Sequence, residues 1–225
     1  PHHLGMKFDA IVSNPPYSKS WPGKNNTILI NDVRYSPDGV LAPIQRSDLA
    51  FTMHMLYHLS ETGTCAIVEF PGVLYRGGAE KKIREYLIKN NFVDTVIQLP
   101  ANLFFGVGIA TCIIVIKKNK KDNNILFVDA SEECEKKGDK NKLEDKNQNR
   151  IVNAYQERKE EQYFTKLVSN DEVLSNGANL SVSSYVEKED KREVIDIVAL
   201  NEEIEALSKD VRNRSVELDE MIKEL

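Results

Sequence analysis

In the stretch FDAIVSNPPY, residues 8–17, a strand-like run ends abruptly at two adjacent prolines. Residues 8–13 are short and mostly apolar, and the Asn-Pro-Pro that follows cannot continue a central strand. Proline fixes φ and has no N–H, and it pushes the residue before it towards extended geometry. The sequence therefore predicts a buried strand that ends in a rigid arm, with an amide at Asn14 and a phenol at Tyr17.

Downstream of the arm, strand patterns alternate with helix patterns. After a loop-like stretch at 18–46, the pattern predicts a helix from Ser47 to about 61, a strand at 65–70, a helix at about 79–90 and a strand at 93–99. This order is typical of an α/β sheet whose strands are mostly parallel.

The strand predicted at 109–116 follows its predecessor after only about nine residues, too few for a helical crossover. Strands 93–99 and 109–116 should therefore pair as an antiparallel hairpin. The predicted fold is a mostly parallel sheet that ends in a hairpin, a variant of the doubly wound α/β arrangement. Residues 125–129 could add an edge strand.

The composition changes after about residue 131, which predicts three parts: residues 1–130, 131–190 and 191–225. Residues 132–150 are rich in Lys, Glu, Asp and Asn and are predicted to form a loop, and residues 150–165 a polar helix. The second part is therefore expected to be a charged loop with a helical extension.

The third part carries a heptad seam. Positions spaced alternately three and four apart are apolar in eight of nine cases: Ile197, Leu200, Ile204, Leu207, Val211, Arg214, Leu218, Met221 and Leu225. Because the other faces are polar, the pattern predicts a long helix that packs on a partner helix; the alternative is a helix lying on its own domain. Arg214 could set the register or meet a carboxylate.

Composition narrows the class of protein. The 225 residues carry a net charge of −5, whereas a chain that binds DNA alone usually has a basic surface, so a partner would supply much of any phosphate contact. Three widely spaced cysteines without a CxxC pair indicate neither zinc nor disulfides and favour the reducing cytoplasm. No apolar run approaches a membrane span and no secretory leader opens the chain, so no membrane partner is expected.

The chemistry of the arm follows from its place. Ligands of open α/β sheets bind beyond the carboxyl ends of strands, where Asn14 Oδ1 and the Pro15 carbonyl would offer two acceptors and Tyr17 a flat face. Two acceptors suit the exocyclic amine of a planar base, because they pull the nitrogen towards sp³ geometry and free its lone pair. The base would first leave the duplex and stack on the ring, which contributes roughly 1–3 kcal/mol. The alternative is a proline-stiffened turn.

Residues 8–21, FDAIVSNPPYSKSW, resemble motif IV of amino-group DNA methyltransferases. Three further segments in order narrow the resemblance to the modification subunit of type I restriction-modification systems: SDLAFTMHMLYHL (47–59), GTCAIVEFPGVLYRGGAEKKIREYLI (63–88) and VIQLPANLFFGVGIATCIIVIKK (96–118). The similarity covers essentially residues 7–186, with ANLSVSSYV (178–186) as a looser match. The resemblance implies a partial Rossmann-like methyltransferase sheet.

The resemblance also implies S-adenosylmethionine as methyl donor and adenine N6 in duplex DNA as acceptor. Asn14 and Pro15 would hold the amino group, with Asn14 also next to the donor, while Pro16 stiffens the arm and Tyr17 stacks on the base. Many members carry Phe at the Tyr17 position. The implied partners are DNA, a specificity subunit on the heptad helix, a restriction subunit and, as a further candidate, another copy of the modification subunit.

The family's Gly-rich cofactor loop should lie upstream of NPPY, and these residues do not contain it. Gly106-Val107-Gly108 lies between the two hairpin strands and opens no helix, and Gly77-Gly78 fits a helix start. The chain thus resembles the C-terminal portion of the subunit, and we expect weak or no activity from it alone. Phe104 or Phe105 could form a second wall of the base pocket; the alternative is core packing.

Weaker signals indicate less. His54 and His58 are four apart on one helix but lack a third ligand, so no metal is predicted. KKNKK (117–121) fits a solvated hairpin end better than a phosphate contact, and Asp32 and Arg34 could pair or face DNA. Two rival functions stay open. One is an amino-group methyltransferase of another restriction type, and the other is a scaffold that assembles through the heptad helix.

Overall fold

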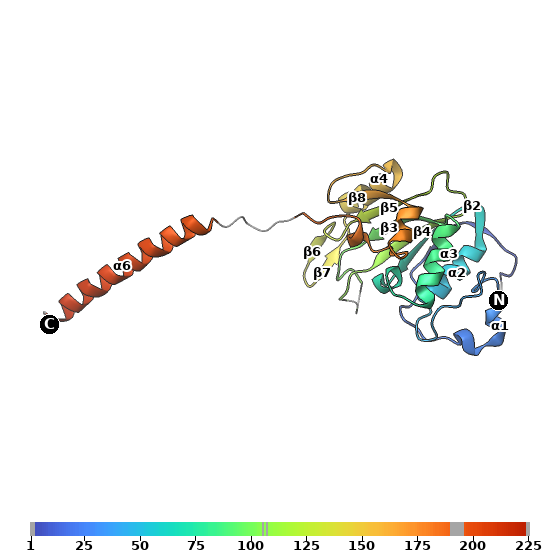
Figure 1. Cartoon of the computed structure of the whole chain (residues 1–225), viewed down its shortest axis with the longest axis horizontal. Coiled ribbons are helices and arrows are strands. Elements are labelled where there is room, and N and C mark those ends of the chain that lie inside the picture. Colours follow the sequence, from blue (N-terminus) through green and yellow to red (C-terminus); the bar gives the residue numbers. More distant parts are fainter. Residues whose placement is uncertain (1–2, 105, 107, 190–195, 224–225) are drawn as a thin grey trace. The chain divides into compact units, whose positions relative to one another are not determined.

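The computed structural model describes residues 3–104, 106, 108–189 and 196–223 (Figure 1). Contacts along the chain divide it into two units, residues 1–188 and residues 189–225. The first unit contains a six-stranded sheet with its covering helices, and the second contains one long helix.

The sheet has the strand order β1-β2-β4-β3-β5-β8. Its strands are β1 (Phe8–Ser13), β2 (Leu59–Glu69), β3 (Val93–Gln98), β4 (Cys112–Lys117), β5 (Asn124–Asp129) and β8 (Thr165–Ser169). β1 is parallel to β2 and β3 to β5, whereas β4 is antiparallel to both β2 and β3, and β8 is antiparallel to β5. Four of the six strands therefore run in one direction, and the predicted mostly parallel α/β sheet is confirmed.

The predicted hairpin is also confirmed, and it lies inside the sheet. β3 and β4 pair antiparallel from Val93 opposite Ile116 to Gln98 opposite Cys112, and the other edge of β4 pairs with β2. β4 is thus paired along both edges, and its side chains point alternately into the cores on the two faces of the sheet, with Ile114 and Ile116 in one core and Ile113 packed against the other. Burial on both faces explains why its sequence CIIVIK is a continuous apolar run.

The strand expected at residues 125–129 is confirmed as β5, but the expectation that it lies at the edge of the sheet was wrong. β5 pairs with β3 on one side and with β8 on the other, from Asn124 opposite Ser169 to Val128 opposite Thr165. Its four apolar residues are fully buried, because Ile125 and Phe127 face one core while Leu126 and Val128 face the other. The covering strand TKLVS is short and half polar, so the sequence pattern did not reveal it.

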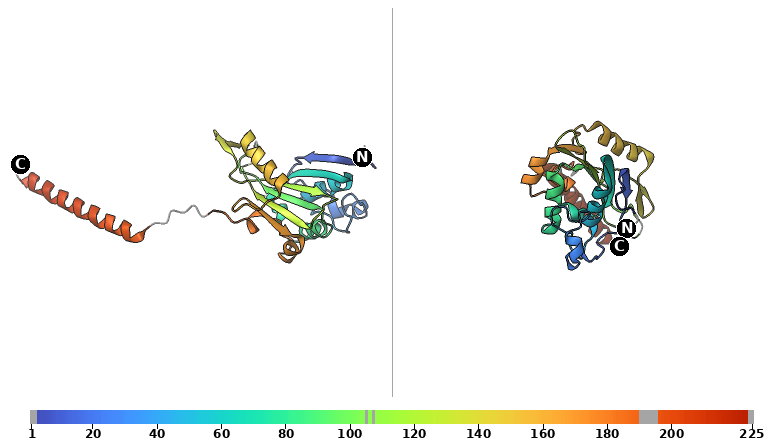
Figure 2. Two further views of the ribbon diagram at one scale, coloured as in Figure 1. Left: turned by 90° about the horizontal axis from the view of Figure 1, so that it is seen from above. Right: turned by 90° about the vertical axis from the view of Figure 1, so that its right-hand side faces the viewer.

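Two hydrophobic cores lie on opposite faces of the sheet. Helices α2 (Asp48–His58), α3 (Ala79–Lys89) and α5 (Asn170–Ser175) cover one face, with the short 3-10 turns η2 (Pro71–Leu74) and η3 (Val182–Ser184). Helix α4 (Asp145–Glu157) covers the other face over β3 and β5, as the two views in Figure 2 show. The loop before α2 contains η1 (Gly23–Asn25) and the one-turn helix α1 (Thr27–Ile30).

The charged stretch after β5 is more ordered than its composition indicated. A small hairpin of β6 (Glu135–Lys137) and β7 (Lys140–Lys142) lies where a loop was predicted, and α4 begins at Asp145 and ends at Glu157 rather than near 165. A capping box between Glu144 and Asn147 starts the helix, and Arg158 ends it with a left-handed φ of 51°. These elements are held in part by ion pairs and helix caps, and such polar contacts leave no apolar periodicity in the sequence that would predict them.

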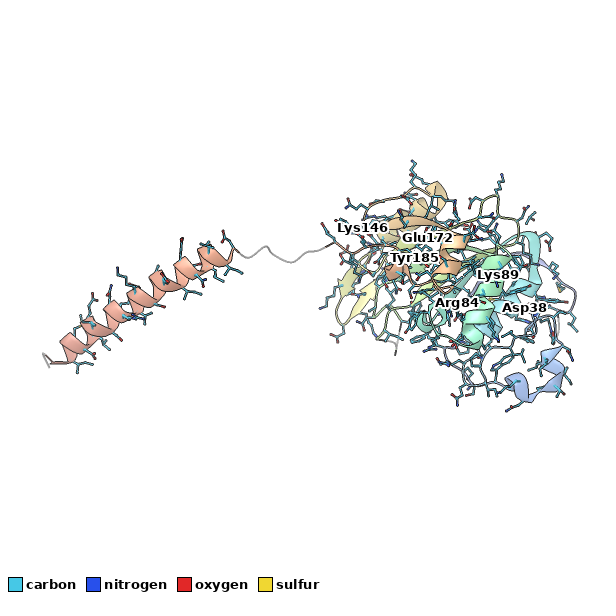
Figure 3. The ribbon with its side chains drawn as sticks, viewed as in Figure 1. Asp38, Arg84, Lys89, Lys146, Glu172 and Tyr185 are labelled. Carbon is cyan, nitrogen blue, oxygen red and sulfur yellow. The ribbon has the colours of Figure 1, made fainter. Side chains whose placement is uncertain are left out.

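A buried arginine joins the segment after α5 to α3. Arg84 of α3 donates from Nε to the Ala178 carbonyl (2.7 Å) and from Nη1 to the Val73 carbonyl (2.8 Å). Burial lowers the pKa of its guanidinium to about 10. The ring of Tyr185, which follows η3, stacks on Phe127 with 4.3 Å between centroids. Figure 3 labels Arg84 and Tyr185. These contacts anchor residues 178–186 to the sheet.

The second unit contains α6 (Ile197–Lys223), which confirms the long helix predicted from the heptads. Its apolar seam residues are exposed, for example Ile197 at 69% and Val211 at 65%; Leu225 lies outside the described residues. Among the helices that the structure describes, none is long and apolar enough to cross a membrane.

Candidate functional site

The NPPY arm lies at the carboxyl end of β1, beside the end of β2. The parallel register places Ser13 opposite Ile67, so the arm begins level with the last residues of β2. Asn14 and Pro16 are exposed, Pro15 is buried and Tyr17 is half-buried. The exposed amide therefore projects from a proline that is packed into the protein.

Asn14 and Tyr17 contact each other within the arm. The Tyr17 hydroxyl donates a hydrogen bond to Asn14 Oδ1 at 2.9 Å. An amide oxygen has two lone pairs, so Asn14 Oδ1 retains capacity for a second donor. In the described residues, the carbonyl oxygen of Pro15 accepts no hydrogen bond. Within the described residues, neither acceptor of the arm is thus saturated by protein donors.

Behind the arm lies a set of buried acidic side chains that the sequence analysis missed. Glu69, the last residue of β2, is fully buried, and the Thr52 hydroxyl donates to its Oε1 at 2.8 Å. The pKa of Glu69 is raised to about 8, mainly by burial and in part by the charge of Asp48. Glu69 is therefore mostly neutral at pH 7. An acidic residue that ends an apolar strand was the available signal in the sequence.

The same surroundings act on the phenol of the arm. Burial raises the pKa of Tyr17, and the charge of Glu69 contributes in the same direction. Burial also raises the pKa of the neighbouring Cys112 thiol, whose Sγ lies 3.4 Å from the Glu69 carbonyl. Tyr17 thus keeps its proton and remains a hydrogen-bond donor across the neutral range.

The two phenylalanines proposed as a second wall lie between β3 and β4. Phe104 is half-buried, and its carbonyl accepts from Lys140 Nζ at 3.3 Å. In the part of the chain that the structure describes, no ring contact joins Phe104 to Tyr17, and Phe105 lies outside the described residues. Their role in the base pocket stays a prediction.

The sheet is open on the side of the arm. The prediction of a buried strand at residues 8–13 was wrong: β1 is an edge strand of the described sheet and none of its residues is fully buried. Val12 is 85% exposed because α4 covers the sheet only over β3 and β5. Gly106, with a φ of 73°, and Gly108 lead into β4 rather than into a helix. Gly77 and Gly78 do precede a helix, since Gly78 is the N-cap of α3 with a φ of 67°, but η2 separates them from β2. The described residues thus include no Gly-rich turn that leads directly from a strand into a helix, which is the turn expected to hold a nucleoside cofactor.

The weaker candidates have structural partners. His54 stacks on Tyr35 (5.4 Å between centroids) and packs edge-on against His58 (4.7 Å), and burial lowers the pKa of His54. No group of three metal-ligating side chains occurs among the described residues. The Arg34 guanidinium binds the Asp32 carboxylate with its Nη2 2.6 Å from Oδ2, so these two pair with each other.

The lysine-rich hairpin end lies at the amino end of β3, away from the arm. Lys117 pairs with Asp94 at 3.4 Å, and Lys118 donates to the Leu59 carbonyl at 2.8 Å. Lys120 donates to the carbonyls of Val93 and Asn124 at 2.7 and 2.8 Å. Each of these lysines is therefore bound to a group at the amino end of a strand.

Residues 1–194 match the sequence model of the family described as N-6 DNA Methylase. The chain belongs to this family. It is 45% identical over 220 residues to the type I restriction enzyme MpnII methylase subunit of Mycoplasma pneumoniae, a match that covers 96% of the chain and 40% of the relative. It is 32% identical to the MjaVII methylase subunit of Methanocaldococcus jannaschii, over 96% of the chain and 38% of the relative.

A solved structure of the family gives the same fold. The type I restriction-modification methyltransferase subunit from Streptococcus thermophilus superimposes with a TM-score of 0.79 at 40% identity, over 83% of this chain and 40% of that one. The chain spans about two fifths of the length of the curated relatives it matches. The family resemblance expected from the NPPY segment and its neighbours is confirmed.

The raised pKa of Glu69 predicts how stability depends on pH. The folded chain holds this proton more tightly than the unfolded chain, because the pKa rises from 4.5 to about 8 on folding. The free energy of unfolding should therefore fall as the pH rises from about 4.5 to about 8. Glu69→Gln has no carboxyl group to titrate at this position and should lack this pH dependence. The difference in melting temperature between Glu69→Gln and the unaltered chain should therefore shift in favour of the variant as the pH rises across that interval.

Thermal unfolding of the 225-residue chain, followed by circular dichroism between pH 5 and pH 8.5, measures the difference. Glu85→Gln, on the surface of α3, serves as control and should follow the unaltered chain. Parallel profiles for Glu69→Gln and the unaltered chain would contradict a protonated Glu69.

Proposed function

We propose that this chain is the base-holding portion of an adenine-N6 DNA methyltransferase subunit of a type I restriction-modification system. The observation that carries the proposal is the NPPY arm at the carboxyl end of β1, with an exposed Asn14 and an unused Pro15 carbonyl. Its place in a chain of the N-6 DNA methylase family, whose curated relatives are named methylase subunits, supports this function. Such a protein would act on DNA in the cytoplasm.

The arm would activate the adenine amino group by positioning it. Asn14 Oδ1 and the Pro15 carbonyl would each accept a hydrogen bond from one N–H group of the amine. These two bonds localise the lone pair on the nitrogen, where it can attack the methyl group. Tyr17 offers its ring to the base, which has left the duplex stack. No strong base is required, because alignment and preorganised acceptors lower the barrier. S-adenosylmethionine supplies the methyl group when bound, and Asn14 is the residue of this chain expected beside it.

Removing the amide should abolish methylation. In the intact subunit, assembled with its specificity subunit, Asn14→Ala should lower methyl incorporation into unmodified plasmid DNA by at least about a hundredfold, the usual effect of losing one preorganised polar partner. Asn153→Ala, an exposed asparagine on α4, is the matched control and should retain full activity. Unchanged methylation by Asn14→Ala would exclude the enzymatic role and favour a scaffold.

The open edge of β1 suggests where the donor pocket is completed. A strand with an unpaired edge and an 85%-exposed Val12 is suited to pair with a further strand, supplied by the portion of the subunit that precedes NPPY in its relatives. The chain alone would then lack most of the S-adenosylmethionine site and have weak or no activity.

Calorimetric titration tests this division. S-adenosylmethionine should give no binding heat with the 225-residue chain, and stoichiometric binding should follow addition of the upstream portion of the subunit. The chain with Val12→Lys is a matched comparison, because a charge on the exposed edge strand should weaken complementation without unfolding the sheet. Stoichiometric binding by the chain alone would place the donor pocket within these residues.

Helix α6 is proposed to pack on the specificity subunit through its seam. Seven seam residues are 44–69% exposed: Ile197, Leu200, Ile204, Leu207, Val211, Leu218 and Met221. Arg214 is already paired, since its Nε lies 2.9 Å from Oδ2 of Asp210 one turn earlier. An apolar stripe of this length needs a partner helix, with the specificity subunit as first candidate and a second modification subunit or the restriction subunit as alternatives.

Disruption of the seam should therefore uncouple assembly. Deletion of residues 193–225, or Leu207→Asp within the seam, should abolish co-purification with the specificity subunit, because a buried unpaired carboxylate is costly. Ala206→Asp adds the same charge at the neighbouring position, about 100° around the helix from Leu207 and outside the seam, and should leave assembly intact. Assembly that survives both seam changes would contradict this surface.

A further inference from the structure

The chain that leaves the NPPY arm is bound directly to the segment that starts α2. The Ser18 N–H donates to Asp48 Oδ1 at 2.8 Å, and the Ser47 N–H donates to the Lys19 carbonyl at 3.0 Å. One step further along, the Trp21 N–H donates to the Ile44 carbonyl at 2.9 Å. These bonds close the long loop at its base, so the position of the arm depends on the start of α2.

Asp48 is the side chain that makes this closure. It is 1% exposed, and it is the first residue of α2, where the positive end of the helix dipole stabilises a carboxylate. The N-cap is Ser47, which makes no side-chain capping bond, and the hydrogen bond that Asp48 accepts comes from Ser18, outside the helix. The hydrogen bond between Asp48 and Ser18 is therefore not a helix-capping bond of α2.

The residue that Asp48 holds has a strained backbone. Ser18 has a φ of 49°, in the left-handed region, which costs a non-glycine residue roughly 1–2 kcal/mol. Such a conformation persists where its surroundings impose it, and a hydrogen bond from a main-chain N–H to a carboxylate is about twice as strong as a neutral one. The Asp48 bond is thus suited to hold the chain in this turn.

Tyr17 is consequently fixed from two sides. Its hydroxyl is bound to Asn14 Oδ1, and the residue that follows it is bound to Asp48. Release of Ser18 would free the main chain at Tyr17 and allow the ring, and with it the Asn14 amide, to leave the geometry needed for a base.

We infer that Asp48 is a positioning residue of the methyl-transfer site: it holds the NPPY arm through Ser18 so that Asn14 and Tyr17 meet the flipped adenine in register. The inference rests on the proposed function. Asp48 itself is buried and touches neither base nor donor, so it acts on the rate through the placement of the arm.

Two further buried carboxylates lie near Asp48. The charge of Asp48 raises the pKa of Glu69 and of Glu80, for both of which burial is the larger cause. Arg46 and Arg76 approach Glu80, each at 3.7 Å, and lower its pKa. An asparagine at position 48 would keep an acceptor oxygen for the Ser18 N–H but would lose the carboxylate charge, so its weaker hydrogen bond should still hold most of the arm in place.

Steady-state methylation of unmodified plasmid DNA by the complete methylase complex tests the inference. Asp48→Ala should lower kcat by roughly ten- to a hundredfold, the effect of misplacing a reacting group, with KM for DNA changed less than twofold. Asp48→Asn keeps an acceptor oxygen for Ser18 and should restore kcat to within about threefold of the unaltered complex. If Asp48→Ala does not fold, Asp48→Glu, which moves the carboxylate by one methylene, should show the same fall.

Asp94→Ala is the matched structural control. Asp94 is a buried aspartate on β3, 3% exposed and paired with Lys117 and Arg158 at the far end of the sheet from the arm. Its loss should lower the melting temperature and leave kcat of the folded complex unchanged. Unchanged kcat in Asp48→Ala, an equal fall in Asp94→Ala, or failure of Asp48→Asn to rescue would each overturn the inference.

Asn14→Ala in the same assay distinguishes a failure of the proposed function from a failure of the positioning role of Asp48. If Asn14→Ala abolishes methylation while Asp48→Ala has wild-type kcat, the positioning inference fails and the proposed function stands. If Asn14→Ala is itself active, the proposed function fails, and the inference fails with it.

Discussion

The parallel pairing of β1 with β2 is the constraint on which the site depends. β1 has this one partner in the described sheet, and its outer edge and one face are exposed. The pairing places the end of β1 level with Ile67, so the arm that follows emerges beside Glu69 and within reach of the first turn of α2. A shift of one residue would turn the side chains of β1 to the other face of the sheet and carry Asn14 with them.

The region behind the arm differs from the rest of the core in its chemistry. Elsewhere the sheet packs Ile, Val and Leu side chains on both faces, with β4 and β5 almost fully apolar. At the carboxyl end of β2, by contrast, Asp48, Glu69 and Glu80 are buried together. Groups of like charge in a buried setting lower stability unless hydrogen bonds and protonation offset the cost, and here Thr52, the Ser18 N–H and a raised pKa at Glu69 do so.

Much of the fold could be predicted because its signals are local. The proline pair ends β1, the apolar runs mark β2 to β5, and the short link between β3 and β4 forces a hairpin. The heptads of α6 are periodic over 27 residues and were equally clear. β8, β6 and β7 were missed because they are short and depend on neighbours, as in the pairing of Thr165 with Val128. Local patterns do not encode which strand will cover which edge.

The rigid arm, the acceptors it carries and the family to which they belong could be read from residues 8–17 and their neighbours, because prolines and local residue types fix these features. The positions of β4 inside the sheet and of β8 beside β5, and the bond between Asp48 and Ser18 thirty residues away, follow from the folded arrangement. The folded arrangement also decides the protonation of Glu69, since a pKa depends on burial and on neighbouring charges. These are long-range properties: they arise when segments distant in the chain exclude water together, and no single stretch of residues contains them.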